Sequence, residues 1–386
     1  ALSVAWGIFM LVILLGAGNG LENSVEEKFA DDAVNSIWVF AGKTSKPHEG
    51  MPIGRPIQLT LDDYQAIRRV PGVEHITARF YLRGGEYAVS YGDKHSAFEI
   101  RSVHPDHLYL EKTLMTSGRF LNDFDIAERT KVAVIGAEVQ KFLFPPGVEP
   151  LGKYIHIGGI AYQVVGVFED VGGEAELRKV YIPITTAQAA YGGGDHIDQV
   201  MFTLSGSLAD AKRIEQSVLS LLSARHRFAA DDRRAVRFRN NVENFAEVQQ
   251  IFQFIRIFLW IVGIGTIIAG IVGVSNIMLI SVKERTREIG LRKAVGATPW
   301  SLVALIVQEA VLLTGVAGYL GLVAGVLSLE LVTRLMPKND YIAHPEVDLG
   351  VALGATVLLV VFGALAGYFP ARRASRVNPI VALREE

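Results

Sequence analysis

The chain has 386 residues, half of them hydrophobic, and a formal net charge of −2 at pH 7. A balance this close to neutral leaves no electrostatic footprint for nucleic acid. The absence of cysteine excludes disulfides, thiolate metal sites and a cysteine nucleophile. Apolar residues concentrate in four blocks and charges in one long middle segment, so the distribution along the chain indicates the class of protein better than the composition does.

Four apolar stretches predict membrane-spanning helices, because ~20 apolar residues in a helix cross the ~30 Å hydrocarbon core of a bilayer. The first is residues 1–20, which could also pass for a signal peptide but has a long apolar run and no basic start. The others are residues 251–282, 300–330 and 349–370, the last with an uncharged run that stops at Pro370. Globular core helices rarely stay uncharged over such lengths, so four spans are the better interpretation.

The distribution of Lys and Arg among the short loops predicts the orientation. These residues are abundant in the loop 283–299 and in the tail 371–386, but scarce in the loop 331–348. We therefore expect the first loop and the tail in the cytoplasm. Residues 21–250 and the loop 331–348 then lie on the outer side.

The outer segment, residues 21–250, alternates short strand patterns with helical ones and predicts an α+β extracytoplasmic domain. The alternation at both ends, with a more strand-rich middle, indicates two subdomains, one of them inserted at about residues 103–198. The last helical pattern, residues 242–255, is amphipathic, and no turn signal separates it from the second span. We expect a continuous stalk from the outer domain into the membrane.

Small and polar residues inside the predicted spans leave alternatives open. GxxxG pairs such as Gly321 with Gly325 and Gly363 with Gly367 allow helix backbones to approach closely, either within one chain or between two chains. Glu309 lies about nine residues into the third span. It is either a functional carboxylate inside the membrane or a group near the cytoplasmic interface that pairs locally.

Two patterns resemble chemical sites only weakly. Residues 147–154 (GVEPLGKY) nearly match the phosphate-binding loop, but Tyr154 replaces the Ser or Thr, Pro150 removes a backbone N–H, and a β-hairpin pattern follows. His104 and His107 lack further ligands at metal-binding spacing, so a solvated loop is a better interpretation than a metal pair. We therefore predict no catalytic residue, no metal site and no cofactor bound by this chain.

The cytoplasmic loop is the most informative short stretch, SVKERTREIGLRKAVGATP at residues 281–299. It predicts a charged helix with Glu288 four residues before Arg292, in the favourable order for an ion pair. Gly296 and Pro299 are expected to end this helix. The alternative is a solvated basic helix that only satisfies the positive-inside rule.

Four segments together resemble the permeases of the MacB/FtsX superfamily of ABC transporters. The loop ERTREIGLRKAVGAT is similar to the coupling segment of that family, and the ending GYFPARRASRVNPIVALREE is similar to its C-terminus. Residues 6–21 resemble the first span of MacB-like members, and residues 150–168 resemble a strand pair of their outer domain. The resemblance covers nearly the whole chain.

This resemblance implies an α-helical membrane protein with four transmembrane helices and an outer domain of a porter-like and a Sabre-like subdomain. It also implies a pair of permease chains, identical or related, that bind ABC ATPase subunits in the cytoplasm of a bacterium. ATP on the ATPases would drive motion that the stalk helices carry across the inner membrane to the periplasmic domain. The coupling pattern falls on Glu284, Arg285, Glu288, Gly290 and Arg292, which we expect to contact the ATPase. Because the sequence contains no Walker A motif, we expect the ATPase on a separate chain.

The leading hypothesis is a MacB-like permease for efflux or secretion that works with a periplasmic adaptor and an outer-membrane channel. A lipoprotein-release permease of the LolC/LolE kind is the sibling hypothesis. An FtsX-like regulator of cell-wall hydrolases would be expected to have a smaller outer domain. A membrane-anchored enzyme or sensor is the alternative from another class, and no catalytic motif supports it.

Overall fold

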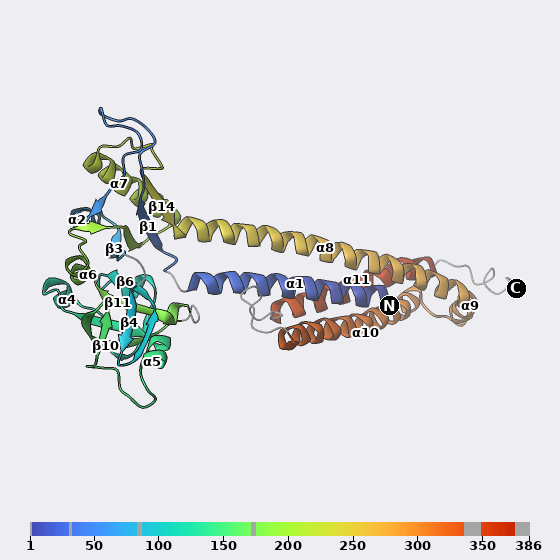
Figure 1. Cartoon of the computed structure of the whole chain (residues 1–386). Helices are drawn as coiled ribbons and strands as arrows, with labels where there is room; N and C mark the ends of the chain where they lie inside the picture. The colour runs from blue at the N-terminus through green and yellow to red at the C-terminus, as the bar shows by residue number, and fades with distance from the viewer. Residues whose placement is uncertain (1, 31–32, 83–86, 171–174, 336–348, 375–386) are drawn as a thin grey trace. The chain divides into compact units, whose positions relative to one another are not determined.

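The structure is a computed structural model, and it describes residues 2–30, 33–82, 87–170, 175–335 and 349–374 (Figure 1). The chain divides into two compact units. One is the outer unit, Lys28–Val248, and the other is the membrane unit, formed by Ala1–Glu27 together with Gln249–Glu386.

The smaller sheet of the outer unit has four antiparallel strands in the order β14-β1-β13-β3. Its strands are β1 (Ser36–Ala41), β3 (Val73–Arg79), β13 (Gln199–Leu204) and β14 (Val236–Asn240). Two helices pack with it, α2 (Leu61–Arg68) and α7 (Leu208–His226). Each begins with a capping box, in which a hydroxyl residue and an Asp three positions on satisfy the first backbone N–H groups.

The larger sheet has the order β5-β4-β9-β10-β8-β11-β6, with β7 paired to β10. Its strands are β4 (Ala88–Tyr91), β5 (Lys94–Ala97), β6 (Glu99–Val103), β7 (Leu114–Gly118), β8 (Val132–Gly136), β9 (Tyr154–Ile157), β10 (Ile160–Glu169) and β11 (Lys179–Pro183). The short elements around the two sheets are β2 (Leu59–Thr60), α3 (His107–Leu110), α4 (Asp123–Ala127), α5 (Ala137–Leu143), the 3₁₀ turn η1 (Glu176–Arg178), α6 (Ile184–Ala190) and β12 (His196–Ile197).

The hairpin β9–β10 confirms the strand pair predicted after the phosphate-loop lookalike. Its turn uses Gly158 and Gly159 at φ +55° and +84°, a left-handed conformation that favours glycine. The stretch GVEPLGKY therefore leads into an antiparallel hairpin, whereas a phosphate loop leads into a helix.

The larger sheet begins earlier in the chain than the expected insertion at residues 103–198. Strands β4, β5 and β6, residues 88–103, belong to it, and β6 pairs in parallel with β11. That pairing joins residues 80 positions apart in the sequence, with Lys179 opposite Glu99. Local strand patterns carry no record of such a partner, which explains the difference. Buried side chains from both sheets, such as Ile37 and Val180, share one apolar core.

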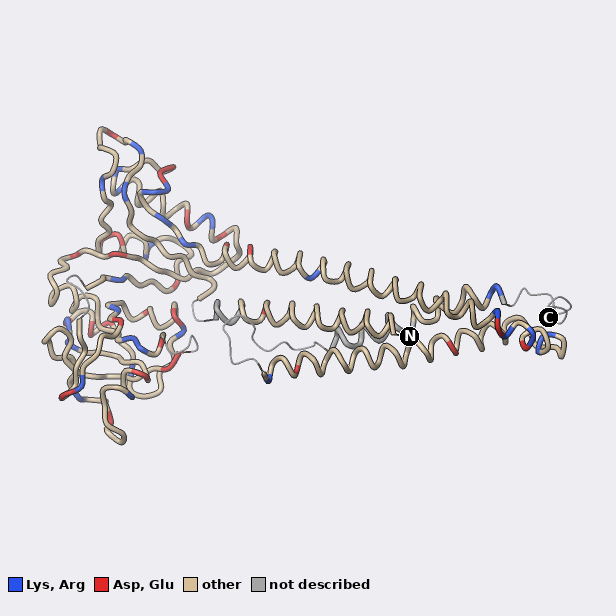
Figure 2. The backbone as a smooth tube through the Cα atoms, turned by 45° about the vertical axis from the view of Figure 1, so that its right-hand side comes forward, with Lys and Arg blue, Asp and Glu red and all other residues tan. Residues whose placement is uncertain are grey.

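The membrane unit is helical: α1 (Leu2–Ala30), α8 (Asn241–Glu284), α9 (Thr286–Ala294), α10 (Pro299–Leu335) and α11 (Leu349–Ala374). Within the described residues, three helices, α1, α8 and α10, are long and apolar enough to cross a membrane. Figure 2 shows long stretches of these helices without charged residues. The fourth predicted span coincides with α11, which continues through Pro370 to Ala374; that α11 crosses the membrane stays a prediction.

The second predicted span and the predicted stalk form one uninterrupted helix. α8 contains 44 residues and begins directly after β14. This confirms that the helix is continuous, as expected from the absence of a turn signal; its role as a stalk stays a prediction. At 1.5 Å per residue such a helix is roughly 66 Å long, about twice the ~30 Å hydrocarbon core.

The GxxxG glycines pack within the chain. A Cβ atom on Gly321 would lie 2.2 Å from the carbonyl oxygen of Ala5 in α1, and one on Gly367 would lie 2.6 Å from Cβ of Ala310. Gly325 and Gly363 have similarly close neighbours in α1 and α10. Contacts between helices of one chain therefore account for these glycines.

Candidate functional site

The predicted cytoplasmic coupling segment folds as the short helix α9 between α8 and α10. Arg285 leaves the helical conformation (φ −98°, ψ 14°) and separates α9 from α8. Gly296 at φ +101° ends α9, and its N–H donates to the carbonyl oxygen of Lys293. Pro299 then begins α10. The predicted stop signals at Gly296 and Pro299 are confirmed, whereas the break at Arg285 has no signal in the sequence.

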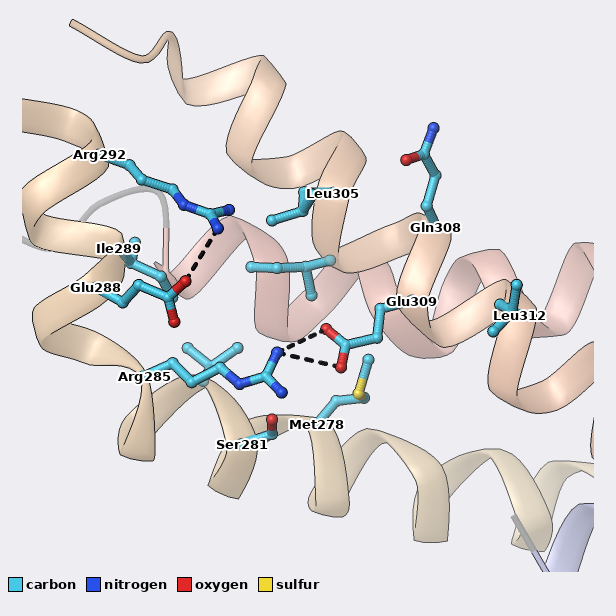
Figure 3. A pocket seen from close by; sticks show the side chains of 12 residues that line it. Met278, Ser281, Arg285, Glu288, Ile289, Arg292, Leu305, Gln308, Glu309 and Leu312 are labelled. Carbon is cyan, nitrogen blue, oxygen red and sulfur yellow. Dashed lines mark hydrogen bonds and ion pairs between the residues drawn. The ribbon is translucent and has the colours of Figure 1, made fainter. Parts of the chain in front are cut away.

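A pocket of about 420 Å³ lies between the end of α8, α9 and the beginning of α10 (Figure 3). Apolar side chains such as Met278 and Leu305 line it together with the polar Ser281 and Gln308. Figure 3 shows two ion pairs among the lining residues. One pair joins the start of α9 to α10, and the other lies within α9.

The first ion pair joins Arg285 to Glu309, with Nη1 of the arginine 3.3 Å from both carboxylate oxygens. It joins the residue directly before α9 to the third turn of α10. Of the two interpretations of Glu309, this contact favours local pairing at the cytoplasmic end of the helix. A carboxylate that has a cation beside it needs no role in a proton or ion path to explain its presence in an apolar helix.

The second ion pair lies on α9 itself, with Nη2 of Arg292 2.9 Å from Oε1 of Glu288. It is the i,i+4 pair predicted from the sequence. Arg285, Glu288 and Arg292 thus line one pocket. Of the other two predicted residues, Glu284 is exposed at the end of α8, and Gly290 is buried.

The sequence reasoning missed three apolar side chains beside this site. Leu291 is 56%, Val295 82% and Trp300 75% exposed. They flank the turn that connects α9 to α10. Several large apolar residues in one short stretch, next to a dense run of charges on a predicted cytoplasmic loop, were the available signal, because exposed apolar side chains that form a patch mark an interaction surface.

His104 and His107 are not in a solvated loop, and this prediction was wrong. Both are buried, and His107 begins α3. Nδ1 of His104 accepts a hydrogen bond from the backbone N–H of Ala78, and its ring stacks on Tyr64 at 4.0 Å between centroids. His107 instead faces Glu111, with Nε2 3.3 Å from Oε2. The two rings therefore take different partners.

Glu111 is the centre of a buried charged cluster that connects the two sheets of the outer unit. Arg79 at the end of β3 contacts it from the smaller sheet. From the larger sheet, Nη1 of Arg101 on β6 lies 2.5 Å from Oε2, and the hydroxyl of Tyr181 on β11 donates to the same oxygen over 2.7 Å. Nζ of Lys179 lies 3.9 Å from Oε2 of Glu111. No motif in the sequence marks this cluster, because its members come from four separate segments.

Burial and neighbouring charges set the protonation of this cluster. Burial raises the pKa of Glu111, but His107, Arg79 and Arg101 together outweigh it and hold the pKa well below its ordinary value. Burial lowers the pKa of His107 to about 4 and that of Lys179 to about 8, in both cases against the opposing effect of Glu111. Near neutral pH the cluster thus has an ionised carboxylate held by guanidinium groups and a neutral histidine.

The fold defines a membrane protein with a large α+β domain outside the bilayer. Residues 1–220 match the family model of the MacB-like periplasmic core domain, and residues 260–379 match that of the FtsX-like permease C-terminal domain. Because the first match covers more than half of the chain, the chain belongs to the family of MacB-like ABC transporter permeases. The predicted resemblance is confirmed.

Two relatives and one solved structure illustrate the similarity. The whole chain is 28% identical to the macrolide export ATP-binding/permease protein MacB of Bdellovibrio bacteriovorus over 393 residues. It is also 28% identical to the pyoverdine export ATP-binding/permease protein PvdT of Pseudomonas putida over 389 residues. The chain spans 58% and 56% of the length of these relatives. The periplasmic region of MacB from Actinobacillus actinomycetemcomitans aligns with 60% of this chain and 98% of its own length, at 19% identity and a TM-score of 0.47.

Proposed function

We propose that this permease transmits the ATP-driven motion of an ABC ATPase to its periplasmic domain, for efflux or secretion of a substrate. The ATPase would bind at α9 and the adjacent turn. ATP hydrolysis would then take place on that ATPase, and residues 1–386 would bind no cofactor themselves. The protein would lie in the bacterial inner membrane, with α11 as the fourth span.

The observation that carries this proposal is the way α9 is attached. The ion pair between Arg285 and Glu309 ties the start of α9 to α10. The same residue, Arg285, is also the single non-helical residue that separates α9 from α8. A partner that moves α9 would therefore act on two membrane helices at once, through one ion pair and one short covalent link.

The length of α8 extends this argument toward the outer unit. The helix is continuous from Asn241, directly after β14, to Glu284, directly before α9. A helix transmits force along its axis because its backbone hydrogen bonds run parallel to that axis. Motion applied at α9 would thus be carried by a single element to the strand that enters the smaller sheet.

The outer partners follow from the relatives. Both are named export proteins, which favours efflux or secretion over lipoprotein release and over regulation of cell-wall hydrolases. We propose a pair of permease chains that works with a periplasmic adaptor and an outer-membrane channel. In this proposal the smaller sheet belongs to the porter-like subdomain and the larger sheet to the Sabre-like one.

Coupling at α9 can be tested by reversing the charge of Glu288. The permease is co-expressed with the ABC ATPase encoded by a neighbouring gene, and co-purification and ATP turnover are measured. Glu288→Lys should weaken both. The matched control is Glu330→Lys, because Glu330 also forms an i,i+4 ion pair with an arginine, Arg334, at the opposite end of α10.

The control should leave assembly and ATP turnover unchanged, since its ion pair lies far along α10 from the pocket. Equal assembly and turnover for Glu288→Lys and the unmodified chain would remove the coupling role of α9. Catalysis by the permease in the absence of any ATPase would instead favour the membrane-anchored enzyme.

A further inference from the structure

The edge strand β14 presents two arginines that are held in place by aromatic rings. Arg237 and Arg239 alternate along the strand and are both exposed. The guanidinium carbon of Arg237 lies 5.0 Å from the ring centroid of Phe40, and that of Arg239 lies 4.8 Å from that of Trp38. Each arginine stands directly opposite its aromatic partner in the register of β14 and β1. Stacking of this kind orders a cation without neutralising it.

The two guanidinium groups have no counter-ion in the described part of the chain. Neither Arg237 nor Arg239 forms an ion pair there, although acidic residues are close in the sequence. Asp231 pairs with Lys46 at 2.5 Å, and Asp232 accepts hydrogen bonds from the backbone N–H groups of Ser45 and Lys46. The exposed Arg233 and Arg234 add further positive charge just before the strand. This edge of the outer unit is therefore strongly basic.

The backbone of β14 has a free side as well. β14 is the last strand of its sheet and pairs only with β1 among the described strands. In an antiparallel ladder, alternate residues of an edge strand direct their N–H and C=O groups away from the sheet. An extended segment that pairs with this edge would bring its side chains into register with those of β14.

We propose that β14 is a docking edge for an extended segment of a partner protein that carries carboxylates at alternate positions. Residues two apart on a strand are spaced by about 6.6 Å on the same face. That is the spacing of Arg237 and Arg239, and it is equally the spacing of two acidic residues separated by one residue on an added strand. Charge, spacing and unpaired backbone groups thus select one kind of occupant, an acidic β-strand.

Charged side chains on an edge strand also discourage unwanted strand pairing. That role needs charge alone and would be served by flexible lysines. Ordered guanidinium groups are suited to carboxylates, which they bind in a planar, two-pronged geometry. The inference concerns the outer unit and does not rest on coupling at α9, so each can fail without the other.

The test measures binding of labelled ten-residue peptides to the full chain in zwitterionic phosphatidylcholine nanodiscs, by fluorescence anisotropy. The main probe alternates glutamate with threonine. One control peptide alternates glutamine with threonine, a second has the same composition as the probe but groups its glutamates in one block, and a third is the probe with alternate backbone nitrogens methylated. The double variant Arg237→Gln/Arg239→Gln is compared with Arg68→Gln/Arg69→Gln, which removes two exposed arginines from the end of α2.

We expect the alternating glutamate peptide to bind at least tenfold more tightly than each control peptide. The β14 double variant should lose at least tenfold of that affinity, and the α2 double variant should keep it. Equal binding of the blocked or methylated peptide would show charge attraction without strand addition and would overturn the proposal. The absence of binding at 1 mM peptide would also overturn the proposal. Two further outcomes would assign these arginines to another occupant and overturn it as well: the chain is a dimer that is lost when Arg237 and Arg239 are changed, or the chain binds phosphatidylglycerol vesicles selectively through these arginines.

Discussion

Removal of the charge at Glu111 should loosen the connection between the two sheets of the outer unit. In Glu111→Gln, the guanidinium groups of Arg79 and Arg101 stay in place with their carboxylate lost, and their side chains are only 7% and 12% exposed. Loss of one partner from a buried ion pair typically costs about 3–5 kcal/mol, because the remaining charge is desolvated without compensation. The substitution keeps the size of the side chain, so the loss reports on charge and not on packing.

Hydrogen exchange of the full chain in detergent measures this loss locally. A cost of about 3 kcal/mol corresponds to roughly 100-fold faster exchange of the amides in β6 and β11 when exchange follows local opening. The matched control is Glu99→Gln, which removes the same charge from a side chain that is 54% exposed and pairs with Arg101. A pair exposed to this extent contributes about 1 kcal/mol or less. If the two variants exchange at the same rate, Glu111 is not the centre of the cluster and the reasoning fails.

Three further predictions concern pH, the stalk and helix packing. Burial lowers the pKa of His104 to about 3, so the unfolded chain binds a proton at this residue before the folded chain does as the pH falls below about 6.5, and up to about 5 kcal/mol of stability is lost between these values. His104→Asn, which keeps a hydrogen-bond acceptor, should make the urea midpoint fall less between pH 7 and pH 4. Part of the fall should remain, because burial also lowers the pKa of His107, to about 4. Glu22 in α1 and Arg256 in α8 form an ion pair at 2.6 Å. Glu22→Arg should therefore lower the free energy of unfolding by about 1 kcal/mol, which is measured as a lower thermal midpoint in detergent. Arg256→Glu in the same chain should restore the midpoint. Gly321→Ala should cost about 1–3 kcal/mol in the same measurement, because its Cβ would meet the main chain of α1, whereas Gly265→Ala, with open space around it, should cost nothing.

The local patterns of the sequence were sufficient to predict individual helices and strands. The hairpin that follows the phosphate-loop lookalike and the amphipathic helix before the second span are present where the residues predict them. Each depends on residues close together in the chain: a β-hairpin pattern, or the absence of any helix stop. Such signals survive without knowledge of the rest of the fold.

The candidate coupling site was only partly accessible from the sequence. The i,i+4 pair of Glu288 and Arg292 could be predicted because helical spacing alone brings the two side chains together. The pair of Arg285 and Glu309 could not, because it depends on how α9 folds back against α10. The sequence left Glu309 with two interpretations, and only the position of Arg285 distinguishes between them.

By itself, the sequence determined the membrane class, the continuity of the helix that enters the second span and the resemblance to MacB-like permeases, and it predicted the orientation. These follow from apolar run length, charge distribution and contiguous motifs, all of which are local properties of the chain. The tertiary structure decided which strands share a sheet, where the buried histidines find their partners, and that Glu111 gathers charges from both sheets. Those features join residues that are far apart in the chain, and their energy comes from burial and pairing that exist only once the chain has folded.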